Sequence, residues 1–321
     1  MKVYGSLAER PKTPAVVTMG SFDGVHRGHR ALISRTVEQA RKKKLCSLVL
    51  TYEPHPRMVL GDPSQVLLLT VLPEKLYFFE QTGLDETLVF PFDRTVAALE
   101  PEEYIEQVML DVLQMKHLLV GYDHLFGRAR RGNVNLLERL AAKHSFELEV
   151  IEPVRYSNEA VKSSAIREHL GSGRFAEALE LLGHPFPLYG KKSKGHGRGK
   201  ELGFPTFNLN VEPHKLLPPA GVYAARVFLK GRFLAGMLYI GTCPTFGDGS
   251  QSVEINVLEG AVDLGSEVLV LAESFIRPDE KFATADELVE KMKTDEKQTR
   301  EYFASRGELA ARGQTGGSVW L

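Results

Sequence analysis

Apolar, β-rich segments alternate with segments of helical periodicity over roughly the first 155 residues, and this alternation constrains the fold more than any other feature. The apolar segments are 15–20, 46–52, 86–92, 117–123 and 148–154, and helices are expected at 29–43, 73–83, 101–115 and 133–144. Strands separated by helices form a parallel sheet with helices on its faces. Ligands bind such sheets beyond the carboxyl ends of the strands. We therefore expect an α/β domain whose site lies in the segments that follow strands.

The pattern changes near residue 184, where two short expected helices (163–173 and 175–183) end and glycine, proline and lysine become frequent. Five β-rich segments then follow, at 205–211, 221–229, 233–241, 252–258 and 267–276, with Lys230-Gly231 as a hairpin turn. A last helix, 284–303, keeps Leu288, Met292 and Tyr302 on one side. The sequence predicts two domains, 1–184 and 185–321: an α/β domain, and an antiparallel β-barrel or sandwich on which the terminal helix packs.

The bulk composition excludes several classes of protein. The formal net charge is -1, so there is no overall basic field for nucleic acid, and any phosphate binding must be local. The two cysteines, Cys46 and Cys243, stand far apart without metal-type spacing, as in a reduced protein. No apolar run approaches a membrane span, and the N-terminus lacks an apolar signal core. We expect a cytoplasmic protein without a membrane partner, and the oligomeric state stays open.

The segment GSFDGVHRGH, residues 20–29, directly follows the first apolar run. A strand, a glycine-containing turn and a helix start offer free backbone N–H groups to an anion. His26 and His29 are three residues apart at the helix start, so both side chains can face one ligand. Imidazoles and backbone donors together suit the charge that develops on a phosphate during displacement. Two surface histidines near a helix cap are the competing interpretation.

Three further segments carry polar residues in an order and at separations that match one known family. They are TYEPHPR (51–57), VGYDHLFGRARRGN (120–133) and VKSSAIREHL (161–170). With residues 20–29 they resemble the H-x-G-H nucleotidyltransferase superfamily, in the form of the FMN adenylyltransferase domain of bacterial bifunctional riboflavin kinase/FAD synthetases. The chain departs from that family at Tyr52 (usually Phe), His124 (another aromatic residue), Lys162 (Ser) and Ser164 (Thr). A hydroxyl survives at Ser164, whereas the role of Lys162 stays open.

The resemblance implies roles for individual residues. It gives His26 and His29 as catalytic residues. It gives a flavin site at His55, Asp123 and Phe126. It gives ATP and phosphate contacts at Gly20, Phe22, Asp23, Gly28, Ser163, Ser164 and Arg167. Taken without the resemblance, His55 also fits an ordinary loop residue, and Arg167 a solvated helix arginine.

The glycine- and lysine-rich segment GKKSKGHGRGKELGFPTFNLNV, residues 190–211, has three interpretations. It suits a flexible linker, a nucleic-acid contact, or a flap whose backbone N–H groups and lysines hold phosphate through Gly195, Gly197 and Gly203. The neutral overall charge and the lack of aromatic residues in its basic part disfavour nucleic acid. Thr206 and Asn208 are two apart on a strand and share a face. Their oxygens suit Mg²⁺, although ordinary strand residues would give the same pair.

The exact sequence of this segment and of those that follow it is more specific than its composition. GFPTFNL resembles the P-T-x-N motif of riboflavin kinase, and GVYAARV, YIGTCPTFG and VEINVLE follow in that family's order. The chain departs from it at Thr242-Cys243, where an arginine is common, and at Tyr239, where asparagine is usual. The resemblance implies Glu254 as proton acceptor and Thr206/Asn208 as magnesium ligands. It also narrows the fold to a Rossmann-like nucleotidyltransferase sheet followed by a riboflavin kinase-like barrel.

The sequence therefore predicts an enzyme with two reactions. The C-terminal barrel phosphorylates riboflavin with ATP and Mg²⁺ to FMN, and the N-terminal domain transfers AMP from ATP to FMN, giving FAD and pyrophosphate. One alternative is a single-activity adenylyltransferase whose barrel only senses flavin; the presence of Asn208 and Glu254 disfavours it. Another is a nucleic-acid-binding protein that uses residues 191–200.

Overall fold

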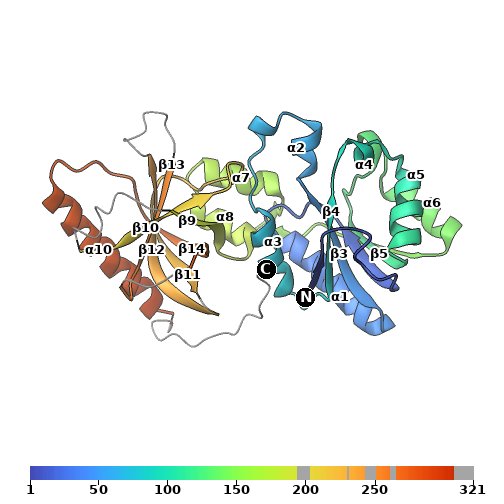
Figure 1. Cartoon of the computed structure of the whole chain (residues 1–321), viewed down its shortest axis with the longest axis horizontal. Coiled ribbons are helices and arrows are strands. Elements are labelled where there is room, and N and C mark those ends of the chain that lie inside the picture. Colours follow the sequence, from blue (N-terminus) through green and yellow to red (C-terminus); the bar gives the residue numbers. More distant parts are fainter. Residues whose placement is uncertain (194–202, 230, 243–250, 261–264, 307–321) are drawn as a thin grey trace. The chain divides into compact units, whose positions relative to one another are not determined.

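The computed structural model describes residues 1–193, 203–229, 231–242, 251–260 and 265–306 (Figure 1). The chain divides into two compact units. The first comprises Met1–Leu68 and Lys75–Ser163, and the second comprises Leu69–Glu74 and the chain from Ser164 onward. A short piece of the N-terminal half therefore belongs to the second unit. The domain boundary predicted between residues 184 and 185 stays a prediction.

The first unit contains a parallel sheet of six strands, as the alternating pattern predicts. The strands are β1 (Lys2–Tyr4), β2 (Ala15–Met19), β3 (Cys46–Glu53), β4 (Glu86–Pro91), β5 (Met115–Gly121) and β6 (Glu147–Ile151), in the spatial order β1-β4-β3-β2-β5-β6. Every neighbouring pair is parallel. The chain runs from β2 to β3 on one side and later places β5 on the other side of β2. The gap between the ends of β2 and β5 is thus the topological switch point, where such sheets bind ligands.

The first unit has helices in the predicted places and further short helices that the periodicity did not predict. They are α1 (Arg27–Lys43), α2 (Pro56–Leu60), α3 (Leu72–Glu80), α4 (Arg94–Ala98), α5 (Pro101–Glu103), a π-helix (Tyr104–Val112) and α6 (Val134–His144). α1 forms because Leu32, Ile33, Val37 and Ala40 make one buried stripe along it. The helix ends at its C-cap, Lys44, which adopts the left-handed conformation. The segment expected as one helix at 101–115 is a short α-helix continued as a π-helix.

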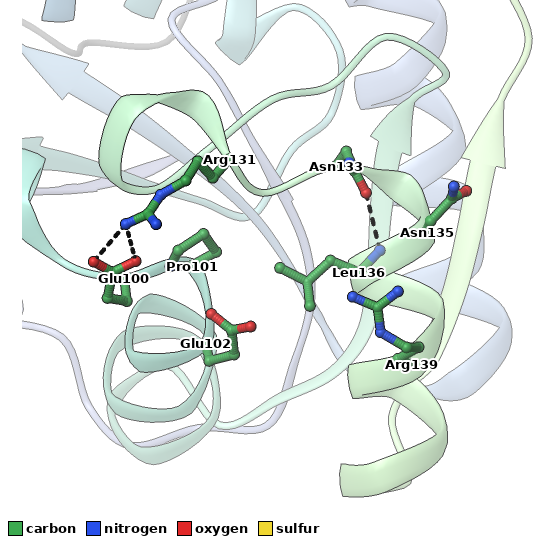
Figure 2. A pocket seen from close by; sticks show the side chains of 8 residues that line it. All are labelled: Glu100, Pro101, Glu102, Arg131, Asn133, Asn135, Leu136 and Arg139. Atoms are coloured by element: carbon green, nitrogen blue, oxygen red, sulfur yellow. Dashed lines mark hydrogen bonds and ion pairs between the residues drawn. The ribbon is translucent and has the colours of Figure 1, made fainter.

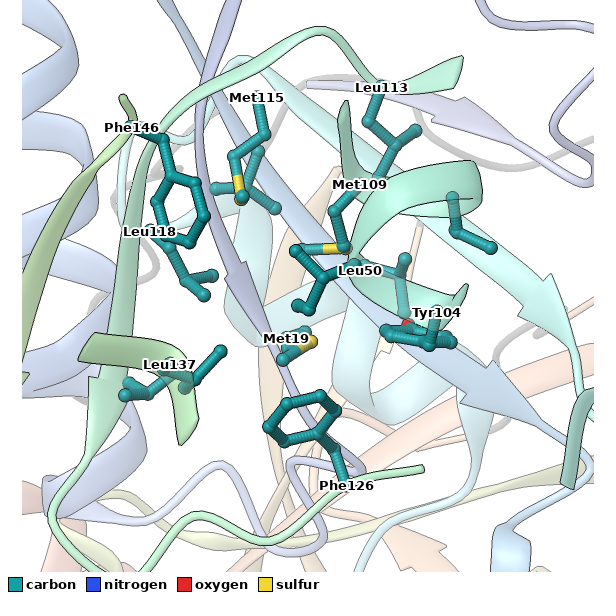
Figure 3. Packing of buried hydrophobic residues seen from close by; sticks show 14 of the residues in the cluster. Met19, Leu50, Tyr104, Met109, Leu113, Met115, Leu118, Phe126, Leu137 and Phe146 are labelled. Atoms are coloured by element: carbon teal, nitrogen blue, oxygen red, sulfur yellow. The ribbon is translucent and has the colours of Figure 1, made fainter. Parts of the chain in front are cut away.

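One face of the sheet packs against the π-helix and α6 (Figure 3). Met19, Leu50 and Leu118 point from the strands toward Met109 and Leu137, and all five are at most 1% exposed. The alternate strand residues, such as Val16 and Thr18, are equally buried on the opposite face, where α1 contacts the sheet. Burial on both faces is why these strands read as continuous apolar runs.

The second unit is built around a closed antiparallel barrel, which confirms the barrel over the sandwich. Its strands are β9 (Phe186–Ser193), β10 (Thr206–Val211), β11 (Gly221–Leu229), β12 (Arg232–Thr242), β13 (Gln251–Val257) and β14 (Glu267–Pro278), in the cyclic order β10-β13-β12-β11-β14-β9. The pairing of Leu229 with Arg232 confirms the hairpin at 230–231; Lys230 lies outside the described residues. The pattern missed β9, because its second half is exposed and rich in lysine.

The described residues of the barrel's part of the chain also form the helices α7 (Ser163–Gly171), α8 (Phe175–Leu182) and α10 (Ala285–Ala304). The predicted terminal helix, α10, packs on β11, β12 and β14. Its most buried residues are Asp295, Thr299 and Phe303. Asp295 is buried because it accepts hydrogen bonds from the Arg277 guanidinium on β14, at 2.9 and 3.0 Å from Nε. The C-terminal tail, 307–321, lies outside the described residues.

Candidate functional sites

The turn between β2 and α1 curls at the switch point of the sheet. Phe22 and Val25 adopt left-handed backbone conformations (φ 48° and 40°), as does Gly24 (φ 91°). Such conformations are costly for Phe and for β-branched Val, and residues keep them chiefly at functional sites. Successive left- and right-handed residues turn backbone N–H groups inward, which forms anion-binding concavities. Residues 20–26 therefore form a turn of the kind that can bind an anion.

The two predicted histidines form one stacked pair. Their ring centroids lie 3.6 Å apart with an interplanar angle of 16°. His26 is the N-cap of α1, and its Nδ1 accepts a hydrogen bond from the His29 backbone N–H at 3.3 Å. An accepting Nδ1 carries no proton, so neutral His26 holds its proton on Nε2 and is a donor there. A Cβ on Gly28 would lie 3.3 Å from the His26 ring, so glycine leaves the ring its space.

His29 is kept neutral. Burial lowers its pKa well below 6.5, and the neighbouring His26 and Lys75 lower it further. Its Nδ1 is buried and has no hydrogen-bond partner among the residues that the structure describes. A buried polar atom without a partner is rare in native proteins and is commonly explained by a catalytic or ligand-binding role. The neutral His29 ring, stacked on His26, can thus face an anion together with it.

Aromatic packing fixes the ring of His29. Phe22 meets His29 edge-to-face at 5.3 Å and Phe79 of α3 at 5.6 Å between centroids. Phe22 is 2% exposed, so it shapes the turn from beneath. Lys75 lies one helical turn before Phe79 and is 1% exposed. Our sequence analysis missed Lys75, although a lysine on the apolar face of an expected helix was a visible signal.

Residues 161–163 also contact the turn between β2 and α1. The Ser163 hydroxyl donates to the carbonyl of Asp23 at 2.9 Å, and the carbonyl of Val161 lies 3.8 Å from a Cβ built on Gly28. Asp23 is itself 4% exposed. The structure thus brings together six predicted residues: Phe22, Asp23, His26, Gly28, His29 and Ser163. Gly20 begins the same turn, directly after β2.

The other predicted residues of this site are distributed differently. Ser164 and Arg167 lie on α7 and belong to the second compact unit. Lys162 remains in the first unit, with its ammonium 5.9 Å from the Tyr122 ring centroid. The hydroxyl of Tyr122 and the charge of Asp123 raise the pKa of Lys162. This cation therefore faces the loop after β5.

The three predicted flavin contacts have separate surroundings. His55 is the N-cap of α2, where its Nδ1 accepts from the Arg57 N–H at 3.1 Å. Asp123 is exposed in the loop after β5. Phe126 is 6% exposed and anchors that loop in the core beside Tyr104 (Figure 3). Only Asp123 of the three presents its side chain openly to solvent.

The barrel carries a second site around one carboxylate. Glu254 Oε2 accepts from the Thr206 hydroxyl and Oε1 from the Ser252 hydroxyl, both at 3.3 Å. Ser252 was not predicted, although the strand alternation puts it on the same face as Glu254, two residues away. Both carboxylate oxygens are therefore held by hydroxyl groups.

Strand register adds two neighbours to Glu254. It lies directly opposite Asn208 of β10 on one side and opposite Tyr239 of β12 on the other. Directly opposed residues of antiparallel strands share a face, so Asn208, Glu254 and Tyr239 form one row across the barrel. The Tyr239 hydroxyl donates to Asp279 at 3.0 Å. Burial, this hydrogen bond and the charges of Asp279 and Glu254 raise the Tyr239 pKa, so the ring stays neutral.

The oxygen atoms around Glu254, from this row and from Thr206 beside it, fit a hard cation. Thr206 supplies a hydroxyl, Asn208 an amide oxygen and Glu254 a carboxylate, which is the chemistry that Mg²⁺ prefers. Gly203 precedes them in a left-handed turn (φ 84°) with open space where a side chain would stand. Gly195 and Gly197, the other glycines of the predicted flap, lie outside the described residues, as does Cys243.

A separate polar recess of about 390 Å³ lies in the first unit between the starts of α5 and α6 (Figure 2). Glu100 pairs there with Arg131 at 2.5 Å, and Asn133 caps α6. No residue predicted for either site lines this recess.

The geometry defines a class of protein: an enzyme of phosphate transfer, with a nucleotidyltransferase-type sheet and a barrel bearing a carboxylate. Family models match residues 8–165 as FAD synthetase and residues 182–303 as riboflavin kinase. A bifunctional riboflavin kinase/FMN adenylyltransferase of Escherichia coli K12 is 36% identical over 300 residues, 93% of this chain and 96% of the relative. Its Bacillus subtilis counterpart is 30% identical over 305 residues, again 93% and 96%. The chain belongs to the family of bifunctional riboflavin kinases/FMN adenylyltransferases.

A solved structure agrees with this assignment at the level of fold. A crystal structure described as a macrolide-efflux protein of Streptococcus pneumoniae matches with a TM-score of 0.81 at 27% identity, covering 93% of this chain and 98% of that one. Family membership confirms the predicted function: the chain is an enzyme of flavin cofactor biosynthesis, with ATP as substrate and FMN and FAD as products. Within the described ranges, no helix is long and apolar enough to cross a membrane.

Proposed function

We propose that the phosphate turn of the first unit carries out adenylyl transfer to FMN. A phosphate oxygen of FMN attacks the α-phosphorus of ATP, the bond from that phosphorus to the bridging oxygen breaks, and pyrophosphate leaves. The proposal is supported by the stacked pair of His26 and His29, since neutral imidazole N–H groups can donate to the oxygens on which charge develops. Backbone N–H groups of residues 20–26 would hold the phosphates, with Ser163 fixing the turn.

Other residues would supply the remaining contacts to ATP and to the flavin. Ser164 and Arg167 would bind the phosphates of ATP, and His55, Asp123 and Phe126 would form the flavin side. Because the His55 Nδ1 caps α2 and Phe126 is buried, both would act by shaping their loops. Asp123 would contact the flavin directly.

The barrel would transfer the γ-phosphoryl group of ATP to riboflavin. The ribityl hydroxyl gives its proton to Glu254, its oxygen forms a bond to the γ-phosphorus, and ADP leaves. Thr206 and Asn208 would hold Mg²⁺, whose charge offsets that of the phosphate oxygens when it is bound. The single observation that supports this role is the position of Glu254, bracketed by Thr206, Ser252 and Asn208 on neighbouring strands. Gly195, Gly197 and Gly203 would form the phosphate flap.

We further propose that residues 1–184 and 185–321 hold the two activities, and that the protein is cytoplasmic. The test of the whole assignment is incubation of the purified chain with riboflavin, ATP and Mg²⁺, with FMN and FAD resolved by chromatography. We expect FMN to appear first and FAD to follow. Folded protein that forms neither product would refute both roles, and FMN without FAD would refute the first.

A further inference from the structure

The second compact unit contains six residues from the middle of the N-terminal half, Leu69–Glu74. We call this segment the strap. Leu69 and Thr70 have no exposed surface, and Val71 is 6% exposed. The family model for riboflavin kinase begins only at residue 182, so the strap lies far outside it.

Glu74 holds the strap by both carboxylate oxygens. Its Oε1 accepts from the backbone N–H of Tyr189 on β9 at 2.8 Å. Its Oε2 accepts from the Val71 N–H at 3.0 Å and from the ammonium of Lys215 at 2.8 Å. The side chains of Glu74 and Lys215 are both 0% exposed. This is a fully buried ion pair between residues 141 positions apart in sequence.

Lys215 reaches the strap in two further ways. Its ammonium donates to the carbonyl of Leu69 at 2.5 Å and lies 4.4 Å from the centroid of the Phe186 ring. The cation therefore bonds both ends of the strap, Leu69 and Glu74. It does so over the first residue of β9.

A buried ion pair is tolerated only while both partners stay in place. Moving either charge from water into the protein interior is costly, and removal of one partner leaves the other uncompensated. Burial raises the pKa of Glu74 in spite of the opposing charge of Lys215, which shows how dry the position is. The buried charge of Lys215 is therefore compensated by a carboxylate from the N-terminal half of the sequence.

We propose that the barrel of the riboflavin kinase carries a docking surface, formed by Lys215, Phe186 and the backbone of Tyr189, whose occupant is the strap Leu69–Glu74 of the same chain. The kinase unit is thus built from two separated segments. A change in the N-terminal half, at Glu74, reduces the stability of the C-terminal activity. The inference rests on the assignment of the kinase to the barrel.

The test compares the heat resistance of the two activities in full-length variants. Samples are heated at graded temperatures, cooled, and assayed separately for riboflavin phosphorylation and for FMN adenylylation. Glu74→Gln keeps the shape and one hydrogen-bond acceptor but removes the charge. We expect it to lower the half-inactivation temperature of the kinase by about 6 °C or more, with a smaller effect on adenylyl transfer.

Two further variants separate the pair from general damage. Glu86→Gln breaks the matched ion pair of the first unit, where Glu86 meets Arg10 at 2.7 Å, and should act first on adenylyl transfer. Glu74→Gln/Lys215→Met removes both charges, so its loss should be smaller than the sum of the single losses. Equal loss of both activities in Glu74→Gln, or no loss, would overturn the proposal, as would additive losses in the double variant.

A measurement on the unaltered chain covers variants that fail to fold. Hydrogen exchange of the amides of Thr70, Val71 and Glu74 should follow the rates of β9 and β14, because a segment exchanges with the cooperative unit that it belongs to. Exchange at the rates of β3 and β4 would refute the strap. If the unaltered chain formed no FMN, the kinase assignment would fall, but the exchange pattern would still decide where the strap belongs.

Discussion

The two candidate sites present opposite hydrogen-bonding chemistry, donors at one and acceptors at the other. The turn after β2 offers hydrogen-bond donors, namely backbone N–H groups and the neutral rings of His26 and His29. The row on the barrel offers oxygen acceptors from Thr206, Asn208 and Glu254. Donors stabilise developing negative charge directly, whereas acceptors repel it unless a cation lies between. A cation between these oxygens and a phosphate is the role proposed above for Mg²⁺ at the barrel.

The largest effect is expected from His29→Ala. Removing one preorganised donor to a developing charge costs about 10²–10³-fold in rate. FAD formation from FMN should fall by that factor, and riboflavin phosphorylation should stay near the parent value. Both turnovers are measured at saturating substrates in one preparation. Equal loss of both, with the fold intact by circular dichroism, would contradict two independent sites.

Glu254→Gln should give the next largest effect, on the kinase alone. Gln keeps the shape and one accepting oxygen, and its NH₂ group can donate to the other hydroxyl, but it cannot take a proton. General-base contributions are about 10²–10⁴-fold, and loose phosphoryl-transfer transition states use the base weakly, so we expect about 10²–10³-fold. The assay is riboflavin-to-FMN turnover at saturating ATP and Mg²⁺. Turnover within about threefold of the parent would make Glu254 an ordinary strand residue.

Ser252→Ala should cost much less than Glu254→Gln. It removes one hydroxyl that orients the carboxylate, and a single hydrogen bond contributes about 0.5–1.5 kcal/mol, or about two- to twelvefold in rate. The loss should appear in the kcat of the kinase, with the KM for ATP unchanged. Ser252→Thr keeps the hydroxyl and serves as the rescue variant. A Thr variant no better than Ala would remove Ser252 from the site.

The smallest expected effect is a pH dependence of the first unit. His29 has a folded-state pKa well below 6.5, chiefly through burial, with His26 and Lys75 adding to it. The unfolded chain therefore binds the proton more tightly, and the contribution of His29 to stability is complete above pH 6.5 and falls as the pH is lowered. Urea unfolding of the first unit at pH 7.5 and 5.5 measures it. His29→Gln should lessen the change; an unaltered one would exclude His29 as its source.

The two sites also show how much of the fold and of the site chemistry can be predicted from the sequence. The alternation of strands and helices in the first unit and most of the barrel strands followed from periodicity, and the resemblance selected the barrel over the sandwich. The chemistry of His26, His29 and Glu254 stays a prediction from spacing and motif. Ser252 was missed because a serine on a strand gives no signal until its carboxylate partner is placed. Lys215 and Glu74 were missed because burial of a charge depends on contacts between distant segments, which local patterns do not contain.

The strap also has a consequence for the order of synthesis. Glu74 leaves the ribosome 141 residues before Lys215, the cation that neutralises it. At about 5–20 residues per second, the delay is about 7–28 s. During that interval the apolar Leu69 and Val71 stand without the barrel that will cover them. The strap is thus exposed until the barrel has been synthesised, and during this interval a chaperone would have the most apolar surface to cover.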